Sequence, residues 1–127
     1  MDDAGVTLPG DEADWFGDDP IHPIPRIFVL DIHAKAADGA GQLELVIASP
    51  LRNDRRSKER LLRKLDVYLD FIHSEAWRDE HGPPALPTAR INVLINRDSD
   101  PEMLELVESC RMWVEQDNHT SFNILHR

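Results

Sequence analysis

The stretch IFVLDIHAKAADGAGQLELVIAS, residues 27–49, decides the fold that we expect for this chain. Apolar and polar residues alternate on both sides of AADGAG, whose Asp-Gly and Ala-Gly steps are typical of a turn. We therefore expect two antiparallel strands joined as a hairpin. The register that gathers the most apolar side chains on one face pairs Leu30 with Ile47, Ile32 with Leu45 and Ala34 with Leu43.

A long helix is expected after the hairpin, beginning near Asn53 or Asp54, either of which can cap it. Leucine and isoleucine recur along it at steps of three and four, and the HGPP segment that starts at His81 ends it. RINVLIN, residues 90–96, is rich in β-branched residues and predicts a third strand. A second helix that begins within RDSDPEM, residues 97–103, and a short last strand in SFNILHR, residues 121–127, complete the order ββαβαβ.

This order predicts the α+β class, as a two-layer sandwich in which two helices cover one face of a mixed four-stranded sheet. Residues 26–127 are expected to form this single domain. Residues 1–25 are acidic, contain Pro and Gly, and have no apolar period of 2 or 3.6. Such a segment buries too little apolar surface to offset the entropy of ordering it, so we expect a flexible tail.

The helix segment RLLRKLDVYLDFIHSEAW, residues 60–77, has paired leucines followed by KL, YL and FI steps. This pattern resembles a small bacterial family of domains of unknown function, in which a strand pair precedes such a helix. The resemblance spans residues 27–127 and implies the same succession of strand pair, helix, strand, helix and strand. It implies no activity and carries over no catalytic residue.

The 127 residues carry a formal net charge of −10, and the first 26 residues hold seven acids against Arg26 alone. This acidity argues against non-specific binding of nucleic acid, because the field of the protein repels phosphate. The one cysteine, Cys110, excludes an internal disulfide and fits a reducing compartment. Neither a signal peptide nor an apolar run long enough to cross a bilayer is visible, so we expect a cytoplasmic protein without membrane contact.

A polar cluster is expected on the sheet face that the helices leave open. The expected register brings Asp31, His33 and Glu44 together there. A histidine between two carboxylates can act as a general base or contribute to a metal site, although such cross-strand pairs also stabilise ordinary sheets. An enzyme that acts on a small ligand or through a metal with these residues is therefore one alternative function.

Apolar side chains predict surfaces for a protein partner or a second copy of the chain. These candidates are Val29 and Val46 on the open sheet face, Val67 and Phe71 as an i, i+4 pair on the long helix, and Trp15 and Phe16 in the tail. Because no catalytic set converges in the sequence, the expected function is a protein-interaction or regulatory domain without enzymatic activity.

A basic block, LRNDRRSKERLLRK at residues 51–64, opens the long helix. Its candidate patch consists of Arg52, Arg55, Arg56, Lys58 and Arg60. Docking of the acidic tail or simple solvation is the favoured interpretation, and weak nucleic-acid binding is the third alternative. No aromatic side chains interleave with the arginines, as a groove for single strands requires, which argues against nucleic acid.

The stretch FIHSEAWRDEH, residues 71–81, holds two histidines and three carboxylates. On one continuous helix His73 and Glu80 would share a side but lie about 10 Å apart along the axis, with His81 pointing well away. That spacing is too long for two ligands of one ion. We therefore expect the polar end of a helix, with neither a metal ion nor a cofactor.

Overall fold

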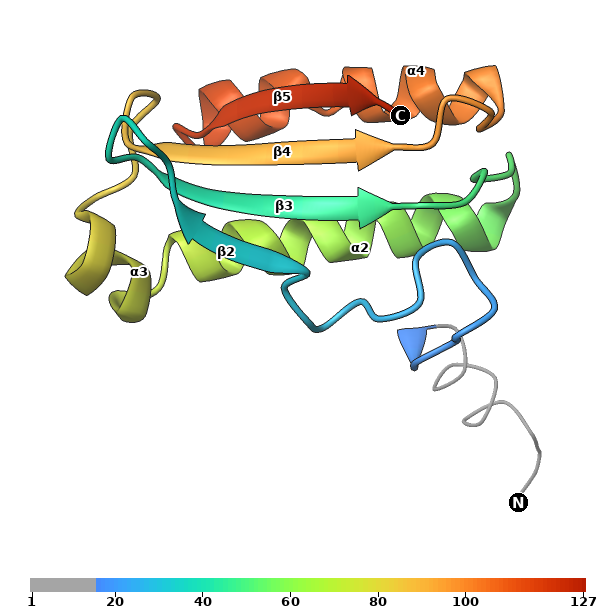
Figure 1. Ribbon diagram of the computed structural model, residues 1–127, viewed down its shortest axis with the longest axis horizontal. Coiled ribbons are helices and arrows are strands. Elements are labelled where there is room, and N and C mark those ends of the chain that lie inside the picture. Colours follow the sequence, from blue (N-terminus) through green and yellow to red (C-terminus); the bar gives the residue numbers. More distant parts are fainter. Residues whose placement is uncertain (1–15) are drawn as a thin grey trace.

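The computed structural model describes residues 16–127, and its elements follow the order β-β-α-α-β-α-β (Figure 1). The elements are β2 (Ile32–Lys35), β3 (Gly41–Ile47), α2 (Arg55–Ile72), α3 (Glu75–His81), β4 (Ala89–Ile95), α4 (Pro101–Ser109), a π-helical turn η1 (Trp113–Asp117) and β5 (Ser121–His126). The α+β class is confirmed, but the expected order ββαβαβ lacks α3. Among the described residues, no helix combines the length and apolarity that a membrane crossing requires.

The four strands form one mixed sheet in the order β2-β3-β4-β5, so each strand pairs with its neighbours in the sequence. β2 runs antiparallel to β3, whereas β3, β4 and β5 are mutually parallel. Parallel neighbours need a crossover, and the α2–α3 segment and α4 supply the two crossovers. The expected mixed four-stranded sheet is therefore confirmed.

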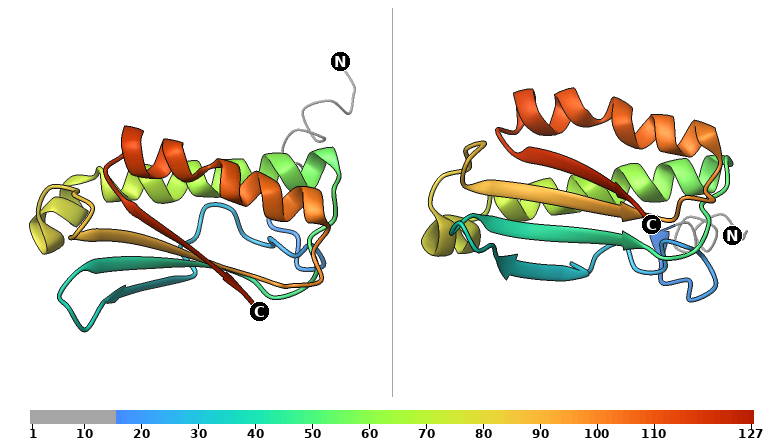
Figure 2. Two further views of the ribbon diagram at one scale, coloured as in Figure 1. Left: turned by 90° about the horizontal axis from the view of Figure 1, so that it is seen from above. Right: turned by 45° about the horizontal axis from the view of Figure 1, so that its top comes forward.

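Helices α2 and α4 lie on the same side of the sheet, and the other side carries no described helix (Figure 2). The burial pattern of β3 alternates strictly, with Leu43, Leu45 and Ile47 buried toward the helices. The side chains of β4 that face the helices are buried in the same way. This alternation is what an antiparallel or mixed sheet covered on one face requires.

The long helix breaks after Ile72, which corrects the expectation of one helix reaching His81. Ser74 has extended backbone angles and accepts a hydrogen bond from the Trp77 N–H at 3.3 Å, so it caps α3. Its hydroxyl also donates to the Phe71 carbonyl at the end of α2, at 2.6 Å. The cap changes the direction of the chain and turns Trp77, which is fully buried, onto the sheet.

Gly41, the first residue of β3, accommodates the side chains of α3. A Cβ atom there would lie 2.6 Å from both the Trp77 Cζ2 and the His81 Cγ atoms. Real Cβ atoms do not approach carbon so closely, so only glycine allows these two rings to rest on the strand. The short helix α3 thereby closes the hairpin end of the sheet (Figure 1).

The hairpin register is shifted by one residue from the expected register, which was wrong. Ile32 pairs with Glu44, and His33 pairs with Leu43. β2 is exposed along its whole length, so burial of one face does not select its register. A one-residue shift moves every β2 side chain to the opposite face, and His33 therefore lies on the helix side.

The turn of the hairpin explains this register. Ala36 and Ala40 close the loop through an N–H···O hydrogen bond of 2.8 Å, and Asp38 accepts a second bond from the Ala40 N–H at 3.0 Å. Gly39 has a φ of 92°, a backbone conformation that glycine adopts readily and that residues with a Cβ atom rarely adopt. The hydrogen bonds of the turn and the backbone conformation of Gly39, rather than the alternation of apolar residues, therefore determine which residues of β2 and β3 pair.

Residues 16–31, called here the N-terminal strap, run past the first half of α2 before β2 begins (Figure 1). Ile24 and Ile27 of the strap are almost fully buried and belong to the core. The expected domain boundary at residue 25 therefore falls within a segment that contributes to the core. Residues 1–15 of the expected tail lie outside the described part of the chain.

Candidate functional site

The sheet side opposite the helices is the face on which the sequence places several of its candidate residues. We call it the uncovered face; its side chains come from all four strands. They are Ile32 and Ala34 on β2, Gln42, Glu44 and Val46 on β3, Arg90, Asn92 and Leu94 on β4, and Ser121, Asn123 and Leu125 on β5.

An aliphatic row crosses this face near the carboxyl ends of the parallel strands. The register aligns Val46 with Leu94 and Leu94 with Leu125. Leu125 is 40% exposed, and Ile32 at the β2 edge is 43% exposed. Other highly exposed aliphatic side chains, such as Ile21 and Met112, lie on separate segments away from this row.

Polar side chains of the uncovered face form hydrogen bonds with one another, and the face has little net charge. Gln42 donates to Glu44 at 3.1 Å and accepts from Arg90 at 3.3 Å. Asn123 donates to Asn92 at 3.0 Å. The face therefore combines five aliphatic side chains with amides and one residue of each charge sign.

The expected cluster of Asp31, His33 and Glu44 is not formed. Glu44 points to the uncovered face, whereas His33 lies on the helix side, where its ring is 5.5 Å from the Trp77 ring. The register shift is the reason. The structure therefore gives no support to a general base built from these three residues.

Asp31 instead belongs to a structural network with α2. Lys64, which is almost fully buried, contacts the Asp31 Oδ1 atom at 2.7 Å, and the Val46 N–H donates to Asp31 Oδ2 at 2.9 Å. The Tyr68 hydroxyl accepts from the Asp31 N–H and donates to the Glu44 carbonyl. Burial lowers the pKa of Lys64 and raises the pKa of Tyr68. These contacts extend the junction of β2 and β3 beyond the last paired residues.

The other predicted apolar candidates fall in three places. Val29 is exposed at the end of the strap, just before β2. Val67 and Phe71 are half-buried and pack against the core, so the expected exposed pair on α2 is not present. Phe16 also packs against the core from the start of the strap, and Trp15 lies outside residues 16–127.

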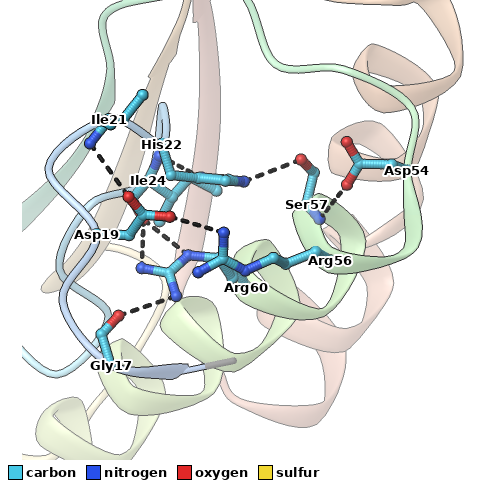
Figure 3. A network of polar contacts seen from close by, with 9 residues as sticks. All are labelled: Gly17, Asp19, Ile21, His22, Ile24, Asp54, Arg56, Ser57 and Arg60. Atoms are coloured by element: carbon cyan, nitrogen blue, oxygen red, sulfur yellow. Dashed lines mark hydrogen bonds and ion pairs between the residues drawn. The ribbon is translucent and has the colours of Figure 1, made fainter. Parts of the chain in front are cut away.

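The basic block contacts the strap (Figure 3). It also reaches the start of α4 through Arg52. Arg56 pairs with Asp19 at 2.6 Å, and this hydrogen bond lowers the pKa of Asp19. Arg60, which is fully buried, donates to the carbonyls of Ile24 and Gly17.

Two further arginines of the block, Arg52 and Arg55, form ion pairs with Asp100 and Glu59. Lys58 lies exposed on the same turns of α2. Three members of the patch, Arg52, Arg56 and Arg60, therefore contact residues outside the block, and the last two organise the strap.

His22 completes the contact between the strap and α2 (Figure 3). Its Nδ1 atom accepts from the Ile24 N–H at 2.9 Å, so Nε2 carries the proton and donates to the Ser57 hydroxyl at 3.1 Å. Burial, together with the charges of Arg60 and Arg56, lowers the pKa of His22. The folded strap therefore favours the neutral imidazole.

We expect His22 to make the protein less stable in mild acid. The unfolded chain takes up a proton near the ordinary pKa of 6.5, whereas the folded chain resists protonation, so the stabilisation present above pH 6.5 decreases as the pH falls below it. In His22→Asn an amide oxygen can still accept the Ile24 N–H but does not titrate. Urea unfolding between pH 7 and pH 5 should show a smaller pH dependence in this variant, and identical slopes would contradict the assignment.

Searches against protein-family models, curated proteins and solved structures found no match for this chain.

Proposed function

We propose that the protein is a non-catalytic binding domain that docks a basic protein partner on the uncovered face. The observation that carries this proposal is the aliphatic row Val46–Leu94–Leu125, which crosses a sheet face that no described helix covers. A contiguous apolar surface on a folded domain marks a site of contact with another molecule more often than an isolated exposed side chain does.

The composition of the uncovered face supports a protein as the ligand. Interfaces between proteins have an apolar centre that is poor in charge, surrounded by groups that form hydrogen bonds. Here the aliphatic row lies beside the amides of Gln42, Asn92 and Asn123. The face is a continuous sheet surface built from rigid strands, which suits a broad protein contact.

The charge of the whole chain supports a basic partner over a second copy. At a net charge of −10, two copies repel each other, whereas a basic protein is attracted and its association is accelerated. The uncovered face itself carries one acid and one base, Glu44 and Arg90. Long-range electrostatic attraction would therefore accelerate association with the partner, and burial of the aliphatic row would supply most of the binding free energy.

The variant Leu125→Glu separates these two contributions. It makes the chain more acidic, which favours a basic partner, but places a charge at the β5 end of the aliphatic row. We expect binding to weaken by about 30-fold or more, because the loss of an apolar contact buried in an interface costs about 2 kcal/mol. Met112→Glu adds the same charge on the helix side, at a side chain that is 65% exposed, and is the matched control.

Affinity capture from lysate of the source cells with the wild-type chain and both variants tests the proposal. Support requires a basic protein that is retained by the wild type and by Met112→Glu, lost with Leu125→Glu and released by salt. Equal retention by all three chains would overturn the role of the face. Light scattering over a range of concentrations should show a monomer; a dimer abolished by Leu125→Glu would assign the face to a second copy instead.

A further inference from the structure

The imidazole rings of His33 and His81 face each other on the helix side of β2, although they are 48 residues apart in the sequence. Their Nε2 atoms are 3.0 Å apart. The Glu80 Oε1 atom lies 3.8 Å from the Nε2 of His33 and 3.7 Å from the Nε2 of His81. Two imidazole nitrogens and a carboxylate oxygen therefore form a compact triangle of donor atoms.

The dimensions of this triangle fit a single metal ion. A point equidistant from the three atoms lies about 2 Å from each of them, which is the length of Zn–N and Zn–O bonds in proteins. Among residues 16–127, these three are the histidine, cysteine and acidic residues whose ligand atoms converge closely enough to share an ion. Two nitrogen ligands favour zinc and its neighbours in the transition series over magnesium or calcium.

The surrounding rings hold the two histidines in this arrangement. Trp77 is fully buried against both of them: its ring stacks on His33 at 5.5 Å and contacts His81 at 4.3 Å. Phe71 packs edge-on against His33 at 5.3 Å. Gly41 leaves the space that the rings of Trp77 and His81 occupy. The ligands are thus positioned by packing, without any rearrangement needed to bring them together.

His81 is the buried member of the triangle. Its side chain is 2% exposed, and its Nδ1 atom has no hydrogen-bond partner among the described residues. Its Nε2 atom is 3.0 Å from the Nε2 atom of His33 and 3.7 Å from the Glu80 Oε1 atom, so this is the nitrogen that the site would use.

We propose that His33, Glu80 and His81 bind one divalent transition-metal ion of the zinc class. The ligands are the Nε2 atoms of both histidines and the carboxylate of Glu80. Three protein ligands leave a tetrahedral position for water or for a donor from another molecule. Glu80 is 60% exposed, so the ion enters from solvent past its carboxylate. The site lies on the helix side of β2 and does not depend on the uncovered face.

Titration of the full chain with Co²⁺ at neutral pH, followed by visible absorption and by displacement with Zn²⁺, tests this inference. We expect one ion per chain and absorption bands typical of tetrahedral or five-coordinate cobalt. The variants His33→Ala and Glu80→Gln should each bind at least about 100-fold more weakly, since loss of a ligand costs more than loss of an outer hydrogen bond. His73→Ala, which removes an exposed histidine bonded to Asn118, is the matched control and should bind like the wild type.

The outcome that would overturn the site is equally specific. Absence of saturable binding by the wild type excludes it, and so does binding that persists in His33→Ala and Glu80→Gln. Far-ultraviolet circular dichroism and thermal unfolding of the metal-free variants establish that the folds are equivalent; Glu80→Gln, at an exposed side chain, keeps the test valid if His33→Ala unfolds. Leu125→Glu should leave Co²⁺ binding unchanged, which separates this site from the proposed partner surface.

Discussion

Replacing Trp77 by alanine is expected to lower the free energy of unfolding by about 3–5 kcal/mol, the largest effect of any single substitution considered for this chain. Trp77 is fully buried and lies against Phe71, His33 and His81. Truncation leaves a cavity between α3 and the start of β3 that neighbouring groups cannot fill completely. Urea unfolding, followed by circular dichroism, measures the change.

The matched variant Trp77→Phe retains most of the ring and removes the indole N–H, which has no hydrogen-bond partner within residues 16–127. The lost contact area and the removed unpaired N–H act in opposite directions, so we expect a loss below about 2 kcal/mol. If the alanine variant were as stable as the phenylalanine variant, α3 would not be packed on the sheet as described, and the positions of His33 and His81 would lose their support.

Replacing Arg60 by methionine is expected to cost about 3 kcal/mol. Arg60 is fully buried; its Nε and Nη2 atoms donate to the Ile24 carbonyl at 2.9 and 2.7 Å, and Nη1 donates to the Gly17 carbonyl at 3.0 Å. Methionine fills a similar volume but cannot donate, so the buried Ile24 carbonyl loses both of these donors. Unfolding in urea measures the loss, and trypsin cleavage after Arg26 should become faster because the strap opens more often.

Lys58→Met is the matched control on the same helix. Lys58 is exposed on α2. Substitutions at exposed positions away from buried polar contacts usually change stability by about 0.5 kcal/mol or less, so this variant should stay close to the wild type in both stability and cleavage rate. Equal effects of the two substitutions would show that the carbonyl contacts of Arg60 do not hold the strap.

The main elements of the fold could be predicted from the sequence because their signals are local. The apolar side chains at every second position of QLELVI, the β-branched residues in RINVLIN and the leucine spacing of the long helix each depend on residues close together in the chain. Ser74 is a cap residue in the middle of an otherwise helical pattern. Apolar periodicity alone did not reveal the break, because the periodic residues continue on both sides of it.

The candidate sites depended on two details that periodicity does not determine. The register of β2 rests on the loop between Ala36 and Ala40, and an error of one residue moved His33 from the helix side to the uncovered face. The break at Ser74 turned His81 and Glu80 away from the axis of α2. Together these details bring His33 to His81. A cap serine within FIHSEAW is the sequence signal that could have indicated the change of direction.

The position of the strap in the sequence also determines when its contacts with α2 can form during synthesis of the chain. Ile24 is synthesised 36 residues before Arg60, the residue that holds its carbonyl. At 5–20 residues per second, about 2–7 s pass between the two, and Arg60 must then leave the ribosome before the contact can form. Throughout that interval Ile24 and Ile27, both buried in the finished protein, have no helix to pack against. The first part of the described chain to be made therefore cannot be fixed before α2 emerges, and until then its apolar side chains are open to chaperones.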